Sequence, residues 1–127
     1  MELEPEANLI VVQAEVFGKE RSRIIRMALD TGATYTIIPW DIAEVLGYDP
    51  ASVRRRVKLT TASGTERAPL LTLKRLKALG CEVEDIDIVC HDLPPESTVD
   101  GLLGLSFLKY LDVNLHFKRR SLELEDP

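Results

Sequence analysis

The residues of this sequence that are best suited to chemistry form the run Asp30-Thr31-Gly32-Ala33. An apolar stretch, Ile24–Leu29, precedes this run, and a second one, Tyr35–Pro39, follows it. The pattern therefore places a carboxylate in a tight turn between two buried strands. An isolated charge is costly in such a place, so Asp30 is expected either to be hydrogen-bonded and paired or to share a proton with a neighbouring group.

The Asp-Thr-Gly tripeptide occurs only once in the chain. Chemistry that needs two carboxylates would therefore take the second one from another copy of the same chain. Taken alone, the tripeptide is weak evidence for catalysis, because its three residues are all common in turns. Its meaning depends on the elements that surround it.

Those elements are predicted to be mostly β-strands, with two short helices. The helices are expected at Trp40–Leu46, closed by Gly47, and at Ser106–Leu111, with Ser106 as the N-cap. The strands are expected at Asn8–Phe17, Ile24–Leu29, Tyr35–Ile38, Val57–Thr61, Glu66–Leu76, Cys81–Cys90, Asp112–Phe117 and Ser121–Leu124.

Three details of this pattern need interpretation. Lys74–Leu79 fits a helix or a strand, and we favour the strand because the apolar period changes partway. Pro69 cannot donate to a strand ladder, which favours an edge or a mobile segment at that position. Asp85 and Asp87 are expected on the solvent face of an alternating strand.

A second motif lies about 70 residues after Asp30, at Gly101-Leu102-Leu103-Gly104 followed by Phe107-Leu108. Taken alone it fits a packed turn. Together with Ala28–Thr34 and Ile37–Pro39, however, it makes the chain resemble the retropepsin-like aspartic proteases, the single-lobe relatives of the pepsins. The resemblance extends from about residue 9 to residue 124. It implies one retropepsin-like domain over residues 1–127, with the acid-protease half-barrel fold and one or two short helices.

The resemblance implies a role for each residue of the first motif. Asp30 would be the catalytic residue of an aspartic endopeptidase, in which two Asp30 carboxylates of a homodimer activate a water that attacks a peptide bond. Thr31 would hydrogen-bond across the dimer axis, and Gly32 would let a backbone amide approach a carboxylate oxygen. Ala33 would leave the substrate channel open.

The resemblance also implies two groups of supporting residues. Leu102, Leu103 and Gly104 would pack beneath the catalytic turn and shape the pocket walls. Ala62, Ser63 and Gly64 would lie in a flap that folds over a bound peptide. Retroviral flap tips are richer in glycine than this one.

The departure at the flap leaves an alternative function open. The chain could be a catalytically weak, dimeric module that binds peptides on the same fold. The intact Asp30, Thr31 and Gly32 favour the enzyme, because a peptide binder gains nothing from two carboxylates forced together.

Composition narrows the range of partners. With 127 residues, of which 45% are apolar, the chain can bury the core of one domain. Its formal charge of -5 argues against nucleic acid as a partner. The basic runs Arg54–Arg56 and Lys118–Arg120 fit solvated turns or helix ends, although a protease could use them to steer an acidic substrate.

The N-terminus and the hydropathy indicate where the protein works. Met1–Glu6 is acidic and polar, unlike a signal peptide, and no window of the sequence approaches a membrane span. We therefore expect a cytoplasmic protein without membrane contact. A soluble domain of a longer or anchored protein would have the same pattern.

The cysteines and histidines give little support for a metal site. Cys81 and Cys90 do not suggest a disulfide framework, and Cys90 ends an apolar run typical of a buried strand. Cys81, Cys90, His91 and His116 are ligand types, but their spacing matches no paired-ligand pattern. No metal or other cofactor is therefore expected.

Overall fold

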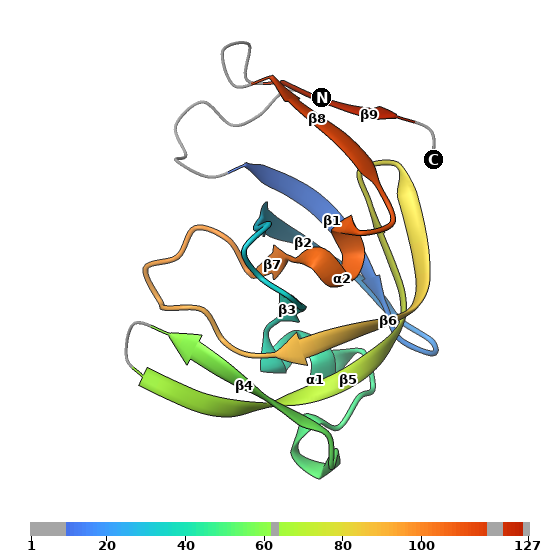
Figure 1. Ribbon diagram of the computed structural model, residues 1–127. Coiled ribbons are helices and arrows are strands. Elements are labelled where there is room, and N and C mark those ends of the chain that lie inside the picture. The colour runs from blue at the N-terminus through green and yellow to red at the C-terminus, as the bar shows by residue number, and fades with distance from the viewer. Residues whose placement is uncertain (1–9, 62–63, 117–120, 126–127) are drawn as a thin grey trace.

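The computed structural model describes residues 10–61, 64–116 and 121–125 (Figure 1). The prediction of a mostly β chain with two short helices is confirmed. In chain order the elements are β1 (Val11–Phe17), β2 (Ser22–Leu29), β3 (Thr36–Ile38), α1 (Trp40–Val45), a 3-10 turn (Pro50–Ser52), β4 (Arg56–Thr61), β5 (Gly64–Ala78), β6 (Cys81–Cys90), β7 (Gly101–Leu103), α2 (Leu105–Leu108), β8 (Asp112–His116) and β9 (Ser121–Glu125).

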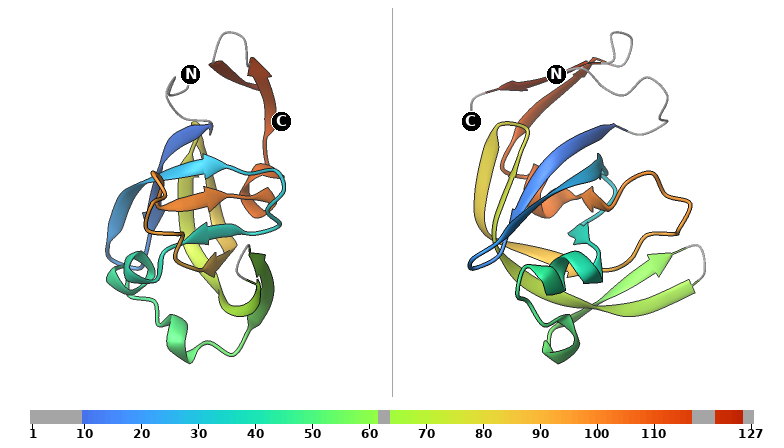
Figure 2. Two further views of the ribbon diagram at one scale, coloured as in Figure 1. Left: turned by 90° about the vertical axis from the view of Figure 1, so that its left-hand side faces the viewer. Right: turned by 180° about the vertical axis from the view of Figure 1, so that it is seen from behind.

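Seven strands form one sheet in the order β1-β2-β7-β3-β6-β5-β4. β1 also pairs with β5, so all of these strands except β4 close into a barrel. β5 is long enough to serve two partners: Gly64–Pro69 pairs with β4, and Leu70–Ala78 pairs with β6. We call β4 together with Gly64–Pro69 the β4–β5 arm, which projects beyond the closed part of the barrel (Figure 2).

The core fills the barrel and includes residues from both helices. Phe107 of α2 is fully buried, as are Met27 of β2 and Leu73 of β5, and Ala43 of α1 belongs to the same cluster. The short helices are therefore held mainly by the apolar side chains that they bury.

The strand interpretation of Lys74–Leu79 is confirmed as far as Ala78, where β5 ends. Leu79 and Gly80 then connect β5 to β6 with positive φ angles of 55° and 74°. Two consecutive residues of this conformation form the turn that best matches the twist of a hairpin. Pro69 is buried and lies opposite Arg56, at the start of β4, where β5 passes from β4 to β6.

Two local predictions were wrong in detail. Ser106 does not cap α2, because the helix begins at Leu105 and the buried Ser106 hydroxyl oxygen instead accepts the N–H of Thr36 at 2.9 Å. The regular alternation expected of β6 breaks at Asp85, which has a positive φ of 52°. At this break Lys74 donates its N–H to the Tyr48 hydroxyl at 2.8 Å. Asp85 is exposed, whereas Asp87 is only partly so.

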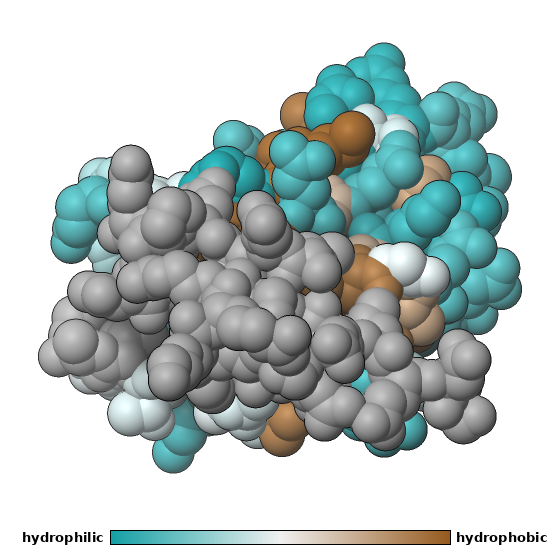
Figure 3. Space-filling model, turned by 90° about the horizontal axis from the view of Figure 1, so that it is seen from above, coloured by the Kyte–Doolittle hydropathy of each residue, from teal (hydrophilic) through white to brown (hydrophobic). Residues whose placement is uncertain are grey.

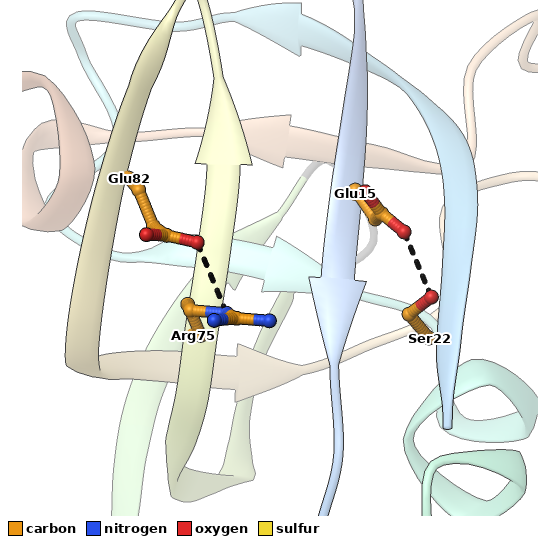
Figure 4. A network of polar contacts seen from close by, with 4 residues as sticks. All are labelled: Glu15, Ser22, Arg75 and Glu82. Atoms are coloured by element: carbon orange, nitrogen blue, oxygen red, sulfur yellow. Dashed lines mark hydrogen bonds and ion pairs between the residues drawn. The ribbon is translucent and has the colours of Figure 1, made fainter. Parts of the chain in front are cut away.

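The outer surface of the barrel carries polar contacts between neighbouring strands (Figure 4). Ser22 donates to Glu15 at 2.8 Å, and Arg75 pairs with Glu82 at 3.1 Å. The guanidinium of Arg75 also lies 4.0 Å from the centre of the Phe17 ring, where β1 meets β5. Exposed ion pairs of this kind contribute about 1 kcal/mol or less, so the barrel depends mainly on its core.

The predicted terminal hairpin is confirmed, since β8 and β9 form a separate two-stranded sheet. It lies at the end of the molecule opposite the β4–β5 arm (Figure 1). Seen from that end, the described surface is mostly hydrophilic, with small hydrophobic patches (Figure 3). In the described part of the chain, no helix has the length and apolar character needed to cross a membrane.

Candidate active site

The turn that carries Asp30 is positioned by three strands. β2 ends at Leu29 and β3 begins at Thr36, but these strands do not pair with each other, because β7 lies between them. β7 runs parallel to β2 and antiparallel to β3. The N–H of Asp30 donates to the carbonyl of Leu103 at the end of β7, at 2.9 Å. The two motifs of the sequence, distant along the chain, therefore meet at the start of this turn.

The Asp30 carboxylate is partly exposed and hydrogen-bonded within its own turn. The carboxylate oxygen Oδ1 accepts the N–H of Gly32 at 2.9 Å, and the backbone carbonyl of Asp30 accepts the N–H of Ala33 at 3.2 Å. A Cβ atom added to Gly32 would lie 3.3 Å from Oδ1, a tight contact. The lack of a side chain at Gly32 therefore helps its amide approach the carboxylate.

The start of α2 supports the other end of the turn. Leu105 donates its N–H to the carbonyl of Ala33 at 2.8 Å, and Ser106 donates its N–H to the carbonyl of Thr34 at 3.0 Å. Gly104 permits this approach, because a Cβ atom there would lie 2.4 Å from the carbonyl oxygen of Tyr35.

A reciprocal pair of buried hydrogen bonds strengthens this support. The hydroxyl oxygen of Ser106 accepts the N–H of Thr36, and the hydroxyl oxygen of Thr36 accepts the N–H of Gly104 at 3.2 Å. Because Thr36 is fully buried, these bonds satisfy polar groups that water cannot reach. The turn is therefore held from β3 and α2 as well as from β7.

A cavity of about 860 Å³ opens beside Asp30. It lies between the Asp30 turn, the β4–β5 arm and the segment of residues 91–100 between β6 and β7, which we call the wall loop. The arm and the wall loop project on the same side of the barrel (Figures 1 and 2). Much of the cavity wall is apolar, from Tyr35, Ile37, Leu59, Leu93 and Leu102.

A polar contact joins two walls of this cavity. Nδ1 of His91, on the wall loop, lies 2.7 Å from Oε1 of Glu66, on the arm. Two further hydrogen bonds anchor the base of the wall loop. The N–H of His91 donates to the carbonyl of Ile38 at 3.0 Å, and Oδ1 of Asp92 accepts the N–H of Trp40 at 3.0 Å.

The structure brings only some of the predicted site residues to the cavity. Asp30, Gly32, Ala33 and Leu102 line it. Thr31 is exposed on the turn, and Gly64 is exposed at the start of β5. Leu103 and Gly104 are buried beneath the turn, and Ala62 and Ser63 lie outside the described residues.

Sequence reasoning missed the polar cavity residues Lys58, Glu66, His91 and Asp92. His91 was considered only as a metal ligand, and its loop was treated as a simple connection. The pairing of β5 with β6 brings the arm and the start of the wall loop to the same side of the barrel. The local sequence pattern does not indicate that these two segments are close. Among the residues that the structure describes, no three His, Cys, Asp or Glu side chains cluster as metal ligands would.

Comparisons with known proteins agree with this architecture. A family model described as gag-polyprotein putative aspartyl protease matches residues 13–110. The crystal structure of a retropepsin-like aspartic protease from Rickettsia conorii is similar with a TM-score of 0.70, at 22% identity, over 98% of this chain and 85% of that chain. At this identity the similarity shows the fold alone.

A curated relative adds a similarity in sequence. The "Uncharacterized protein in cobV 5'region" of Sinorhizobium sp. is 31% identical over 114 residues, which are 89% of this chain and 46% of that protein. The chain thus spans about half the length of this relative. Because the family model covers most of the chain and the barrel agrees with it, the chain belongs to the retropepsin-like family of gag-polyprotein putative aspartyl proteases.

Proposed function

We propose that this chain is one subunit of a homodimeric aspartic endopeptidase. The observation that carries the proposal is the Asp30 carboxylate, which a supported turn presents to a large and partly apolar cavity. Membership of an aspartyl protease family supports the same reaction. Each chain has a single Asp-Thr-Gly, so the active site needs two chains.

The reaction follows from two Asp30 carboxylates placed across a two-fold axis. Two carboxyl groups so close cannot both carry a negative charge, so the pair shares one proton. The ionised carboxylate accepts a proton from a bound water, and the protonated one donates to the scissile carbonyl oxygen. The water attacks the carbonyl carbon to form a tetrahedral diol. The pair then returns a proton to the leaving amine as the C–N bond breaks.

The neighbouring residues would serve this reaction in different ways. Thr31 is exposed in a single chain, which leaves its side chain available for a contact across the dimer axis. Leu102 would contact the substrate, whereas Leu103 and Gly104 would support the turn from beneath. The β4–β5 arm would act as a flap over an extended peptide, with its tip at Ala62, Ser63 and Gly64. We further propose that residues 1–127 form one such domain.

The Asp30→Asn variant tests this proposal. The amide oxygen can still accept the Gly32 N–H, so the fold should persist, whereas the pair loses a carboxylate. At any pH from about 4 to 7, we expect Asp30→Asn to cleave a mixed peptide library at least about a thousandfold more slowly than the wild type. A statine-type inhibitor should block cleavage by the wild type, and sedimentation should show that Asp30→Asn still forms the dimer.

Asp41→Asn is the matched control, because Asp41 is an exposed carboxylate on α1 that does not line the cavity and accepts the neighbouring backbone N–H of Ile42. It should cleave peptides like the wild type. Undiminished cleavage by Asp30→Asn, or cleavage by a strictly monomeric protein, would contradict the proposal. Dimers that bind peptides without any inhibitor-sensitive cleavage would favour the peptide-binding module instead.

A further inference from the structure

The β4–β5 arm receives less backbone support than the rest of β5. Within the arm, Gly64–Pro69 pairs with β4, and pairing with β6 begins at Leu70. Glu66 lies in this stretch before the pairing with β6, opposite Leu59, and its side chain is 54% exposed. A side-chain contact from Glu66 to the barrel can therefore influence where the arm lies.

His91 is a fixed partner for such a contact. It follows the fully buried Cys90, and its own N–H is bound to the carbonyl of Ile38 in the barrel. The next residue, Asp92, is bound to the N–H of Trp40 at the start of α1. The imidazole is only 23% exposed, so its position is restricted by packing as well as by these backbone contacts.

We propose that His91 and Glu66 are positioning residues that hold the β4–β5 arm beside the Asp30 cavity. Their 2.7 Å contact joins the arm to the wall loop, and both side chains line the cavity that contains Asp30. The contact sets the width of the space that a substrate must enter. Its effect on catalysis rests on the proposed protease function, but the contact itself does not.

The pair shares its cavity with other polar side chains, namely Asp30 and Tyr35, Lys58 of β4 and Asp92 of the wall loop. Among the contacts of the described residues, the one between His91 and Glu66 connects the arm directly to the wall loop. Removing this contact should therefore loosen the arm.

Hydrogen–deuterium exchange of the arm amides tests this independently of any activity. Protection at Thr65–Arg67, corrected for intrinsic exchange, should be about two- to fivefold lower in Glu66→Gln than in the wild type. Glu96→Gln changes an exposed carboxylate of the wall loop that does not line the cavity, and it should behave like the wild type.

Two substitutions at His91 separate the contact itself from a general effect of mutation. The amide nitrogen of Asn can lie close to the position of Nδ1, so His91→Asn should keep part of the protection, whereas His91→Ala should lose as much as Glu66→Gln. Protection of Glu66→Gln or His91→Ala equal to that of the wild type would overturn the proposal.

Kinetics then test the consequence for substrate entry. With a peptide that the wild type cleaves, Glu66→Gln should change KM about two- to fivefold near pH 5.5 and leave kcat nearly constant, whereas Asp30→Asn should abolish kcat. Unchanged KM would overturn the role in substrate entry. If the wild type cleaves no peptide, the proposed function fails, while the exchange experiment still decides whether the contact holds the arm.

Discussion

At the scale of single residues, the Asp30 turn depends on two glycines for different reasons. Gly32 lets its amide reach the Asp30 carboxylate. Gly104 leaves room for the carbonyl oxygens of Ala33 and Tyr35, which a Cβ atom would approach to 2.7 Å and 2.4 Å. Both contacts involve backbone atoms of the turn, so a larger residue at position 104 must displace the turn itself.

Gly104→Ala should therefore destabilise the protein by about 1–3 kcal/mol, the usual cost of overpacking. Urea unfolding followed by circular dichroism measures this change. Gly80→Asn is a suitable control, because a Cβ atom at Gly80 meets nothing within 4 Å and Asn tolerates its positive φ of 74°. Equal stability of Gly104→Ala and the wild type would show that the turn adapts freely.

Cys90 links stability to pH. Burial raises the pKa of its thiol from 9.0 to about 12, and the negative charges of Asp92 and Glu44 add to the effect. The unfolded chain releases this proton near pH 9, whereas the folded chain retains it until about pH 12. The stabilisation is thus complete below pH 9 and is lost as the pH rises toward 12.

Between about pH 9 and pH 10.5, this thiol should lower the free energy of unfolding by up to about 1.4 kcal/mol per pH unit. Urea unfolding at several pH values should show a shallower decline for Cys90→Ala than for the wild type. Cys81→Ala, which removes the less buried thiol, should retain the wild-type slope. Parallel declines for Cys90→Ala and the wild type would contradict the assignment.

At the scale of elements, Tyr48 joins three parts of the fold. It follows α1, donates its hydroxyl to the carbonyl of Phe17 at the end of β1 at 3.0 Å, and accepts the N–H of Lys74 in β5. This last bond satisfies an amide at the point where Asp85 interrupts the alternation of β6. The hydroxyl therefore ties α1 to β1 and β5 where the strand pattern is irregular.

Tyr48→Phe should lower the free energy of unfolding by about 1–2 kcal/mol, because two hydrogen bonds are lost and the ring remains. Tyr110→Phe is the matched control, since Tyr110 is 51% exposed and the same atom is removed. Chemical denaturation of both variants checks the difference. A loss no larger for Tyr48→Phe than for Tyr110→Phe would mean that the hydroxyl contributes nothing specific.

At the scale of the whole molecule, each chain carries one Asp30 and therefore half of the proposed catalytic pair. Residues that support the turn come from the same chain, through β7, β3 and α2. The arrangement of a single chain thus accounts for the shape of the turn, but not for a complete pair of carboxylates.

Activity should consequently depend on protein concentration. Below the dissociation constant of the dimer, total activity should rise with the square of the protein concentration, so specific activity should fall on dilution. Sedimentation over the same concentrations measures the dimer fraction, which should follow specific activity. Constant specific activity where sedimentation finds only monomer would rule out a shared site.

The sequence by itself determined most of the strands, both helices and the terminal hairpin, because apolar periodicity and turn residues reflect local burial. Its two motifs also indicated the family, and that resemblance implied the approach of the Gly32 amide to a carboxylate, which the structure contains. No local sequence pattern predicted that β7 lies between β2 and β3 in the sheet.

The tertiary structure alone decided the contacts between distant segments. Ser106 looked like a helix cap, but burial against β3 made its hydroxyl a partner for Thr36. His91 and Glu66 lie 25 positions apart and meet only because β5 and β6 pair and the arm extends beside the wall loop. Such contacts depend on how whole strands pack, which a residue's immediate neighbours in the sequence do not specify.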